Sequence, residues 1–218
     1  MISITESVRK FIKDSPLVEE VLSRGLINLS AFARELKPKI EEELMKPVKN
    51  GSIVMALKRV SRQLDRTNQK VTKTIQAGSE LTVRSNLSEY TYISSETLAN
   101  KYVALSQQIY QHPNAFFTLT KGLRETTRIV STSLKKELEG TFRKEALVSK
   151  IENLSSITIT HSKEVVYMPG FHYLILKSLA WENVNVIESV SAYTEFTVIV
   201  ESKDVDKAFG ILKRLINE

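Results

Sequence analysis

Apolar residues near the start of the chain recur every three or four positions, which is typical of amphipathic helices. Ser15-Pro16 is a helix-start signal, Gly25 is a stop signal, and Asn28 or Ser30 can cap the next helix. After the turn at Asn50-Gly51-Ser52, a further buried stripe consists of Ile53, Leu57, Val60 and Leu64. The pattern therefore predicts helices only, up to about residue 66.

The period then changes from helical to alternating. VTKTIQ (71–76) and SELTVRS (79–85) flank Ala77-Gly78, which together predict a β-hairpin, although Ala-Gly is a weaker turn signal than Asn-Gly. Three helices followed by a hairpin is the order of a winged helix-turn-helix. Residues 1–76 are therefore predicted to form a winged-helix-like domain.

An internal repeat occupies the remainder of the chain. FFTLTKGLRETTRIVS (116–131) aligns with VIESVSAYTEFTVIVE (186–201), so that Glu125 matches Glu195 and Ile129 matches Ile199. A strand and a helix are predicted before each copy, and a helix after it. Two ferredoxin-like βαββα units with antiparallel sheets are therefore expected, without an evident fourth strand in either, and the fold class is α+β.

Composition narrows the kind of protein. The 218 residues include no cysteine, which excludes disulfides, thiolate zinc sites and cysteine nucleophiles. The start of the chain lacks the apolar segment of a signal peptide, and no stretch is apolar enough to span a membrane. A cytoplasmic protein is expected.

The net charge of +6 lies in the first 76 residues, which hold 15 Lys/Arg against 9 Asp/Glu. This asymmetry suggests a polyanion such as duplex DNA as a partner of that part. The candidate nucleic-acid-binding residues are Lys58, Arg59, Arg62, Arg66, Lys70 and Lys73. The alternative is a solvated helix surface that Glu41-Glu42-Glu43 neutralises in part.

The C-terminal repeat, PGFHYLILKSLAWENVNVIESVSAYTEFTVIVESKDVDKAFGILKRL, resembles an ACT domain, and most closely those that regulate aspartate kinases. The shared features are the Pro-Gly before the first helix, the Asn-x-Asn that opens the second strand, and the TEFTVIV strand before the last helix. Residues 154–218 are predicted to be this ACT domain. Residues 80–142 are predicted to be a degenerate ACT-like unit, with Ser94-Ser95-Glu96 where the second copy has Met168-Pro169-Gly170. No part of the chain resembles a kinase domain.

The resemblance implies a small effector, often an amino acid, bound where the loop before the first helix meets a strand of a neighbouring ACT unit. The positions that match are Met168, Pro169, Gly170, Phe171, Asn183 and Asn185. A helix N-terminus offers free N–H groups to a carboxylate, and glycine allows close backbone approach. The alternatives are a plain turn at Pro-Gly and capping roles for the two asparagines.

No catalytic, cofactor or metal-binding motif occurs, and the three histidines lack ligand spacing. The sequence therefore predicts a non-enzymatic regulator that senses an amino acid or related metabolite and binds DNA, without a cofactor. ACT units with exposed sheet edges favour a homodimer or a larger assembly. The alternatives are a free-standing ACT subunit that controls an amino-acid biosynthetic enzyme, and an enzyme of unrecognised type.

Overall fold

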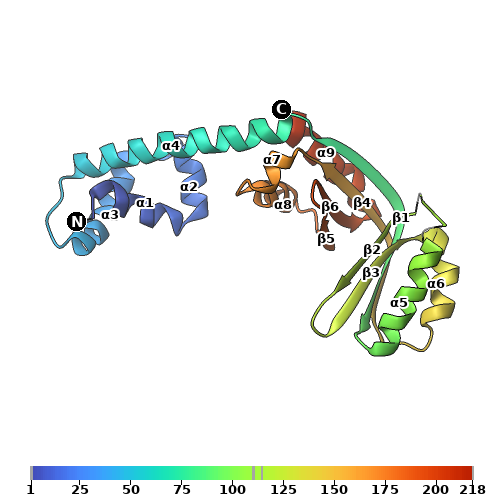
Figure 1. Ribbon diagram of the computed structural model, residues 1–218. Helices are drawn as coiled ribbons and strands as arrows, with labels where there is room; N and C mark the ends of the chain where they lie inside the picture. The colour runs from blue at the N-terminus through green and yellow to red at the C-terminus, as the bar shows by residue number, and fades with distance from the viewer. Residues whose placement is uncertain (1, 110, 114, 218) are drawn as a thin grey trace. The chain divides into compact units, whose positions relative to one another are not determined.

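A computed structural model of the chain describes residues 2–109, 111–113 and 115–217, except for the side chains of residues 16, 65–71, 104, 106–108 and 136–139. These residues form two compact units, which we term the helical unit (Met1–Lys73) and the sheet unit (Thr74–Glu218) (Figure 1). No helix within the described ranges is long and apolar enough to cross a membrane.

The helical unit begins with three helices that start and stop where their capping residues predict. They are α1 (Ile4–Lys13), α2 (Pro16–Ser23) and α3 (Leu29–Leu44). Asn28 caps α3 by accepting the N–H groups of Ser30 and Ala31, each at 3.1 Å. Gly25 follows α2 with φ +70°, and its position allows Leu26 N–H to donate to Val21 O at 2.9 Å. The predicted signals at Pro16, Gly25 and Asn28 are thus confirmed.

The core of the helical unit consists of the predicted apolar stripes. Ile53, Leu57 and Val60 of α4 (Asn50–Gln76) are buried against the other three helices, and Leu64 packs at the margin. The buried partners are Val8 and Ile12 of α1, Leu22 of α2, and Ala33, Leu36 and Ile40 of α3.

The predicted hairpin is wrong, because residues 71–76 are the last turns of α4. This segment is rich in β-branched residues, which suggested a strand. Extending a helix that already exists costs little, however, and Ile75 falls in helical register with the earlier stripe and is buried. The helix ends at Gln76. Gly78 follows with φ +103°, and Ser79 Oγ donates to Ile75 O at 2.5 Å. The chain therefore has no wing at this position.

The sheet unit contains the predicted element order twice. The first copy is β1 (Glu80–Ile93), α5 (Glu96–Ile109), β2 (Phe117–Lys121), β3 (Glu125–Ser131), the 3₁₀ turn η1 (Thr132–Leu134) and α6 (Lys135–Phe142). The second is β4 (Leu147–Thr160), α7 (Lys163–Val166), α8 (Phe171–Trp181), β5 (Glu188–Ser191), β6 (Glu195–Glu201), the 3₁₀ turn η2 (Ser202–Asp204) and α9 (Val205–Asn217). Among the described residues of the sheet unit, the short helix α7 is the element without a counterpart.

The six strands form one antiparallel sheet in the order β2-β3-β1-β4-β6-β5. β1 and β4 are each 14 residues long, about twice the length of β3 and β6. The second half of each long strand is the first strand of its own repeat and pairs with that repeat's third strand, β3 or β6. The first half of each long strand pairs with the second half of the other long strand, which belongs to the other repeat. Each repeat thus obtains its missing fourth strand from the other, in the ferredoxin-like order 4-1-3-2.

The two long strands carry the same irregularity at their midpoints. Asn86 and Asn153 have φ of +59° and +58°, and each precedes a Leu-Ser pair. Asparagine tolerates this left-handed backbone better than other residues with a Cβ. The pairing shifts register between Arg84 and Leu87, and Leu87 then lies opposite Leu154. The Asn-Leu-Ser repeat therefore marks the place where each strand passes from one repeat to the other.

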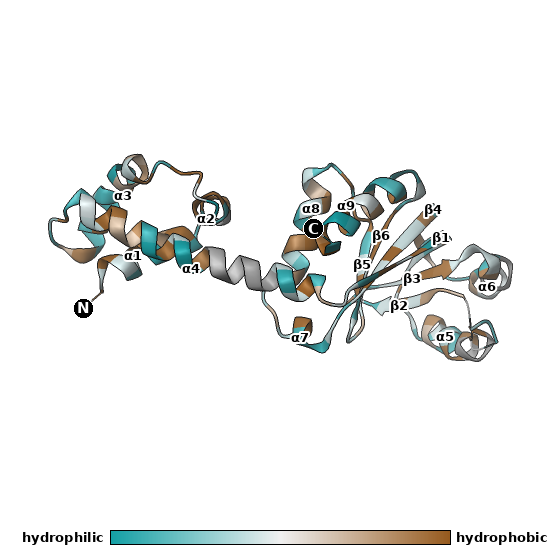
Figure 2. Cartoon of the chain, turned by 90° about the horizontal axis from the view of Figure 1, so that it is seen from above, coloured by the Kyte–Doolittle hydropathy of each residue, from teal (hydrophilic) through white to brown (hydrophobic). Residues whose placement is uncertain are grey.

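All four long helices of the sheet unit cover one face of the sheet, α5 and α6 over the first repeat and α8 and α9 over the second (Figures 1 and 2). Tyr90, Tyr92 and Val130 pack against α5 and α6, and Phe196 meets Phe171 of α8. The opposite face carries an apolar cluster that joins both repeats. It consists of Leu87, Ile129, Leu154 and Ile199, with Phe116, Ile151 and Ile187 at its margin.

Glu89 lies on the cluster face with 7% of its surface exposed, and its Oε2 has no hydrogen-bond partner. Burial, aided by the charge of Glu188, raises the pKa of Glu89. The ionised form is therefore disfavoured in the folded state, so the stability of the fold decreases as the pH rises from the unfolded pKa through the folded one.

We expect Glu89→Gln to raise the free energy of unfolding at neutral pH by roughly 1 kcal/mol, because it removes a buried charge that has no partner. The gain should vanish at low pH, where Glu89 is protonated. Urea denaturation across pH measures both. Glu125→Gln, at an exposed position of β3, is the matched control and should change little. Equal effects of the two variants would contradict the prediction.

Candidate functional site

The predicted effector loop leads directly into α8. Gly170 precedes the helix with φ +97°, makes no side-chain cap, and has no atom within 4 Å of the place where a Cβ would lie. The first hydrogen bond of the helix runs from Leu174 N–H to Gly170 O at 3.0 Å, so the N–H groups of residues 171–173 have no acceptor within the helix. Pro169 and Gly170 are exposed and Met168 is half-buried. The turn therefore offers open space in front of a helix N-terminus.

Phe171 belongs to the core rather than to the surface of this loop. Its side chain is 2% exposed and its ring contacts those of His161, His172 and Phe196, with centroids 4.7, 5.3 and 6.0 Å away. His172 contacts Phe196 as well, at 4.6 Å. The ring of Phe171 therefore anchors the first turn of α8 on the sheet, and only its backbone N–H faces the loop.

Asn183 lies beyond the other end of α8. It has φ +56°, its N–H donates to Ala180 O at 3.0 Å, and Val184 N–H donates to Leu179 O at 3.0 Å, which is the geometry of a helix C-terminal cap. Asn185 is exposed. Eleven helical residues at about 1.5 Å each separate Gly170 from this corner by about 16 Å. One repeat by itself therefore does not bring the two halves of the predicted site together.

The predicted basic face lies along α4. Lys58, Arg59, Arg62 and Lys73 are exposed, and at 100° per residue they fall within about 100° of the helix circumference. Lys58, Arg59 and Arg62 line a shallow groove with Met55 and Gln63. The side chains of Arg66 and Lys70 lie outside the described residues.

The acidic run does not neutralise this groove. Glu43 pairs with Lys10 at 2.6 Å, and Glu41 accepts Val48 N–H at 2.7 Å. In the part of the chain whose side chains are described, no acid forms an ion pair with the three basic residues of the groove. Among the described side chains, the three basic residues of the groove therefore have no acidic partner.

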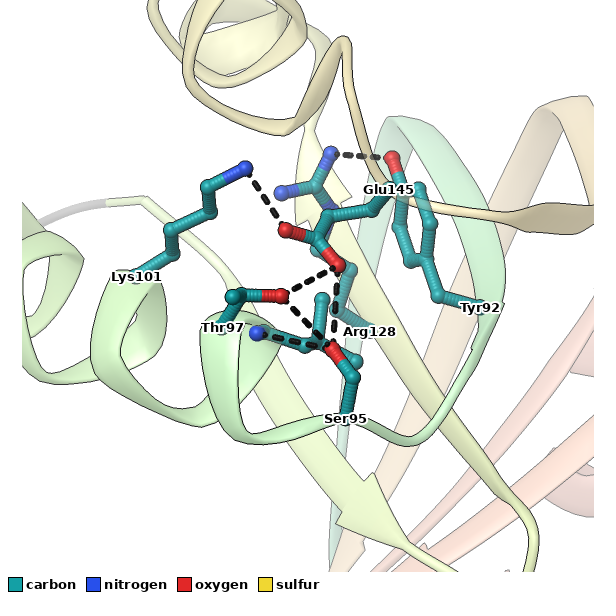
Figure 3. Close-up of polar contacts among 7 residues, drawn as sticks. Tyr92, Ser95, Thr97, Lys101, Arg128 and Glu145 are labelled. Atoms are coloured by element: carbon teal, nitrogen blue, oxygen red, sulfur yellow. Dashed lines mark hydrogen bonds and ion pairs between the residues drawn. The ribbon is translucent and has the colours of Figure 1, made fainter.

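A polar cluster that sequence reasoning missed lies at the start of α5 (Figure 3). The carboxylate of Glu145 is 2.6 Å from Lys101 Nζ and accepts the hydroxyls of Ser95 and Thr97 at 3.1 and 3.3 Å. Its side chain is only 6% exposed. Lys101, with the two hydroxyls, holds the pKa of Glu145 below its usual range. Residues 95 and 145 are far apart in sequence, and no motif signalled their contact.

A buried arginine lies nearby in the same repeat. The guanidinium of Arg128 is enclosed by the rings of Phe142, Tyr90 and Tyr92, whose centroids are 4.0, 4.7 and 5.2 Å away, and it donates to Tyr92 Oη at 3.0 Å. Burial raises the pKa of the neighbouring Tyr102 to about 12. Within the described ranges, no three His, Asp or Glu side chains are grouped so as to hold a metal ion.

Comparison with known proteins identifies the fold of the sheet unit. The sequence matches no family model and no curated protein. Among solved structures, the aspartokinase alpha and beta subunits match with a TM-score of 0.52 and 11% identity, over 63% of this chain and 97% of the other. The aspartate kinase of Clostridium acetobutylicum matches with a TM-score of 0.50 and 14% identity, over 63% of this chain and 34% of the other.

This chain thus spans about a third of the length of the Clostridium enzyme. At these identities the likeness shows the fold alone. The sheet unit has an ACT-like fold, similar to that of the regulatory domains of aspartate kinases, as the sequence resemblance predicted.

The two asparagine positions can be tested for a purely structural role. Because Asn183 adopts a left-handed backbone, Asn183→Gly should be neutral or slightly stabilising, whereas Asn183→Ala should lower the free energy of unfolding by about 1 kcal/mol. Chemical denaturation measures both. Asn185→Ala, at the exposed neighbour, serves as the control and should be close to neutral. A glycine variant as unstable as the alanine variant would show that the side chain of Asn183 does more than cap the helix.

Proposed function

We propose that this chain is a non-enzymatic regulator whose sheet unit senses an amino acid or a related metabolite at the start of α8. The observation that carries the proposal is the uncapped N-terminus of α8 behind Gly170, in an ACT-like fold. The partial positive charge of a helix N-terminus and its free N–H groups suit a ligand carboxylate. The Clostridium enzyme that shares the fold is described as allosteric.

A second copy of the chain would complete the site. α8 runs opposite in direction to β4 and β5, and β5 is an edge strand of the sheet. If two copies paired antiparallel along β5, their α8 helices would lie antiparallel and side by side. The Gly170 end of one helix would then approach the Asn183–Asn185 end of the other. The proposed effector therefore binds between two chains of a homodimer, with Met168 and Pro169 of one chain at the rim.

A thermal-shift screen of the twenty amino acids tests the sensor. A ligand at 100 times its dissociation constant should add about 2.7 kcal/mol to the free energy of unfolding. Gly170→Asp should abolish the response, because its carboxylate would occupy the helix N-terminus, while Gly170→Asn has nearly the same shape without the charge and should retain most of it. No response of the wild type to any amino acid would reject an amino-acid effector.

The helical unit favours a second activity, the binding of duplex DNA through the groove formed by Lys58, Arg59 and Arg62. Three uncompensated cations on one helix can neutralise phosphates and release counterions. Because residues 71–76 form no wing, the proposal is supported by the basic groove and not by a winged-helix geometry. The simplest mode of DNA binding is contact of the groove with the phosphate backbone. Effector binding would shift such an activity only by the difference in its affinity for two arrangements, typically about 1–3 kcal/mol.

Fluorescence anisotropy with labelled duplex across a salt series tests DNA binding. Arg59→Ala with Arg62→Ala should reduce the slope of log K against log salt by about 2, because two phosphate contacts are lost. Arg34→Ala with Lys39→Ala, on the exposed side of α3, removes the same charge elsewhere. Equal slopes in the two double variants, or a wild-type slope near zero, would reject the basic groove as a DNA site.

The alternative partner is a protein. Leu17 of α2 and Leu26, which lies just after this helix, are both exposed. Exposed apolar side chains of this kind suit docking on an enzyme. The chain would then be a free-standing regulatory subunit for an amino-acid biosynthetic enzyme. Absence of salt-dependent DNA binding together with an intact amino-acid response would favour this second role.

A further inference from the structure

The carboxylate of Glu145 lies where a small acid would bind at the start of α5 (Figure 3). Lys101 Nζ meets its Oε1 at 2.6 Å, and the hydroxyls of Ser95 and Thr97 meet its Oε2. An ammonium and two hydroxyl donors around one carboxylate form the donor set that a binding site offers to a carboxylic ligand. Here the protein supplies the acid itself, from the loop between α6 and β4.

The directions of the protons make this site selective for an anion. Ser95 Oγ accepts Leu98 N–H at 3.0 Å, so the serine caps α5 and its own proton remains for Glu145. Thr97 Oγ1 is 3.0 Å from Ser95 Oγ and donates to the same Oε2. Both hydroxyl protons, and those of Lys101, need an acceptor. A carboxylate accepts all of them. An amide at this position would place its NH₂ group, which is a donor, against another donor.

Among the described residues, the position of the second repeat that corresponds to Glu145 carries no acid. The Asn-Leu-Ser repeat aligns β1 with β4, and on this alignment Glu145, two residues before β4, corresponds to Gly78, two residues before β1. Gly78 has no side chain, and no atom lies within 4 Å of the place where its Cβ would be. The helix that corresponds to α5 is α8, which begins at Gly170 without a side-chain cap. The two repeats therefore differ at two of the four residues that form the cluster in the first one, the cap and the acid.

We propose that Glu145 is a built-in ligand, whose carboxylate fills in the first repeat the place that an effector carboxylate fills in the second. The inference rests on the proposed function, since it takes the start of α8 as the effector site. The first repeat is thereby held permanently in its occupied form and does not respond to free effector. Only the second repeat, where Gly78 and Gly170 leave the place open, acts as the sensor.

Chemical rescue tests the proposal. Glu145→Ala should lower the melting temperature by roughly 2–4 °C, because it removes a partly buried ion pair and leaves Lys101 without its partner. Sodium acetate, compared with sodium chloride at equal ionic strength, should restore a large part of that loss by binding at the vacated site. Saturation transfer to the acetate methyl group should be detectable for Glu145→Ala and absent for the wild type. Adding Ser95→Ala and Lys101→Met should remove it.

Glu152→Ala is the matched control. Glu152 also pairs with lysines, at 2.5 Å from Lys135 and 3.4 Å from Lys150, but it is 42% exposed and has no hydroxyl donors. Acetate should therefore not rescue Glu152→Ala beyond the effect of chloride. Glu145→Gln, which keeps the shape and loses the charge, should be destabilised and should not respond to acetate, since the place remains filled.

Acetate that acts no better than chloride on Glu145→Ala, or equally on Glu152→Ala, overturns the built-in ligand. If Glu145→Ala is unfolded without acetate, refolding in acetate supports the proposal and continued unfolding rejects it. These results are independent of α8. An acetate site in Glu145→Ala beside a wild type that binds no amino acid would support the carboxylate site and reject the proposed sensor. Amino-acid binding by the wild type, without acetate rescue of Glu145→Ala, would support the proposed sensor and reject the built-in ligand.

Discussion

The antiparallel pairing of β1 with β4 is the constraint on which the sheet unit depends. Each strand serves two repeats, and both carry a left-handed asparagine and a register shift beside the Leu87–Leu154 pair, where the exchange takes place. The apolar cluster behind that pair takes residues from both repeats, so neither repeat completes its sheet or that cluster alone. The two repeats are therefore one compact unit that shares a sheet and an apolar cluster.

The repeats share an order of strands and helices but differ in their buried polar groups. The first has a buried guanidinium among aromatic rings and an internal carboxylate at its helix start. On the alignment of β3 with β6, the residue of the second repeat that corresponds to Arg128 is Val198, and Ile157 and Ile159 are buried beside it. A buried arginine tolerates few geometries, since its charge must keep its contacts. The first repeat thus holds a buried charge where the second has an apolar core.

Sequence reasoning succeeded where a local rule decides the structure. Helix starts at Pro16 and Asn28, the stop at Gly25, and the repeated strand and helix order all follow from residues close to one another in the chain. It failed at residues 71–76, where β-branched residues suggested a strand. Extending the long helix α4 through this segment costs little, and the segment is therefore helical. The capping role of Asn183, which the sequence alone left open, follows from its left-handed backbone, and its place in an effector site stays a prediction.

The sequence by itself determined the element order of the two repeats, the buried stripes, the basic composition of α4 and the glycine that opens α8, because each depends on spacing, charge or backbone freedom within a few residues. Only the tertiary structure decided that each repeat borrows a strand from the other, that Glu145 meets Ser95, Thr97 and Lys101, and that Gly170 and Asn183 lie at opposite ends of one helix. These facts depend on which distant segments pair, and pairing follows from the joint burial of both repeats rather than from any local pattern.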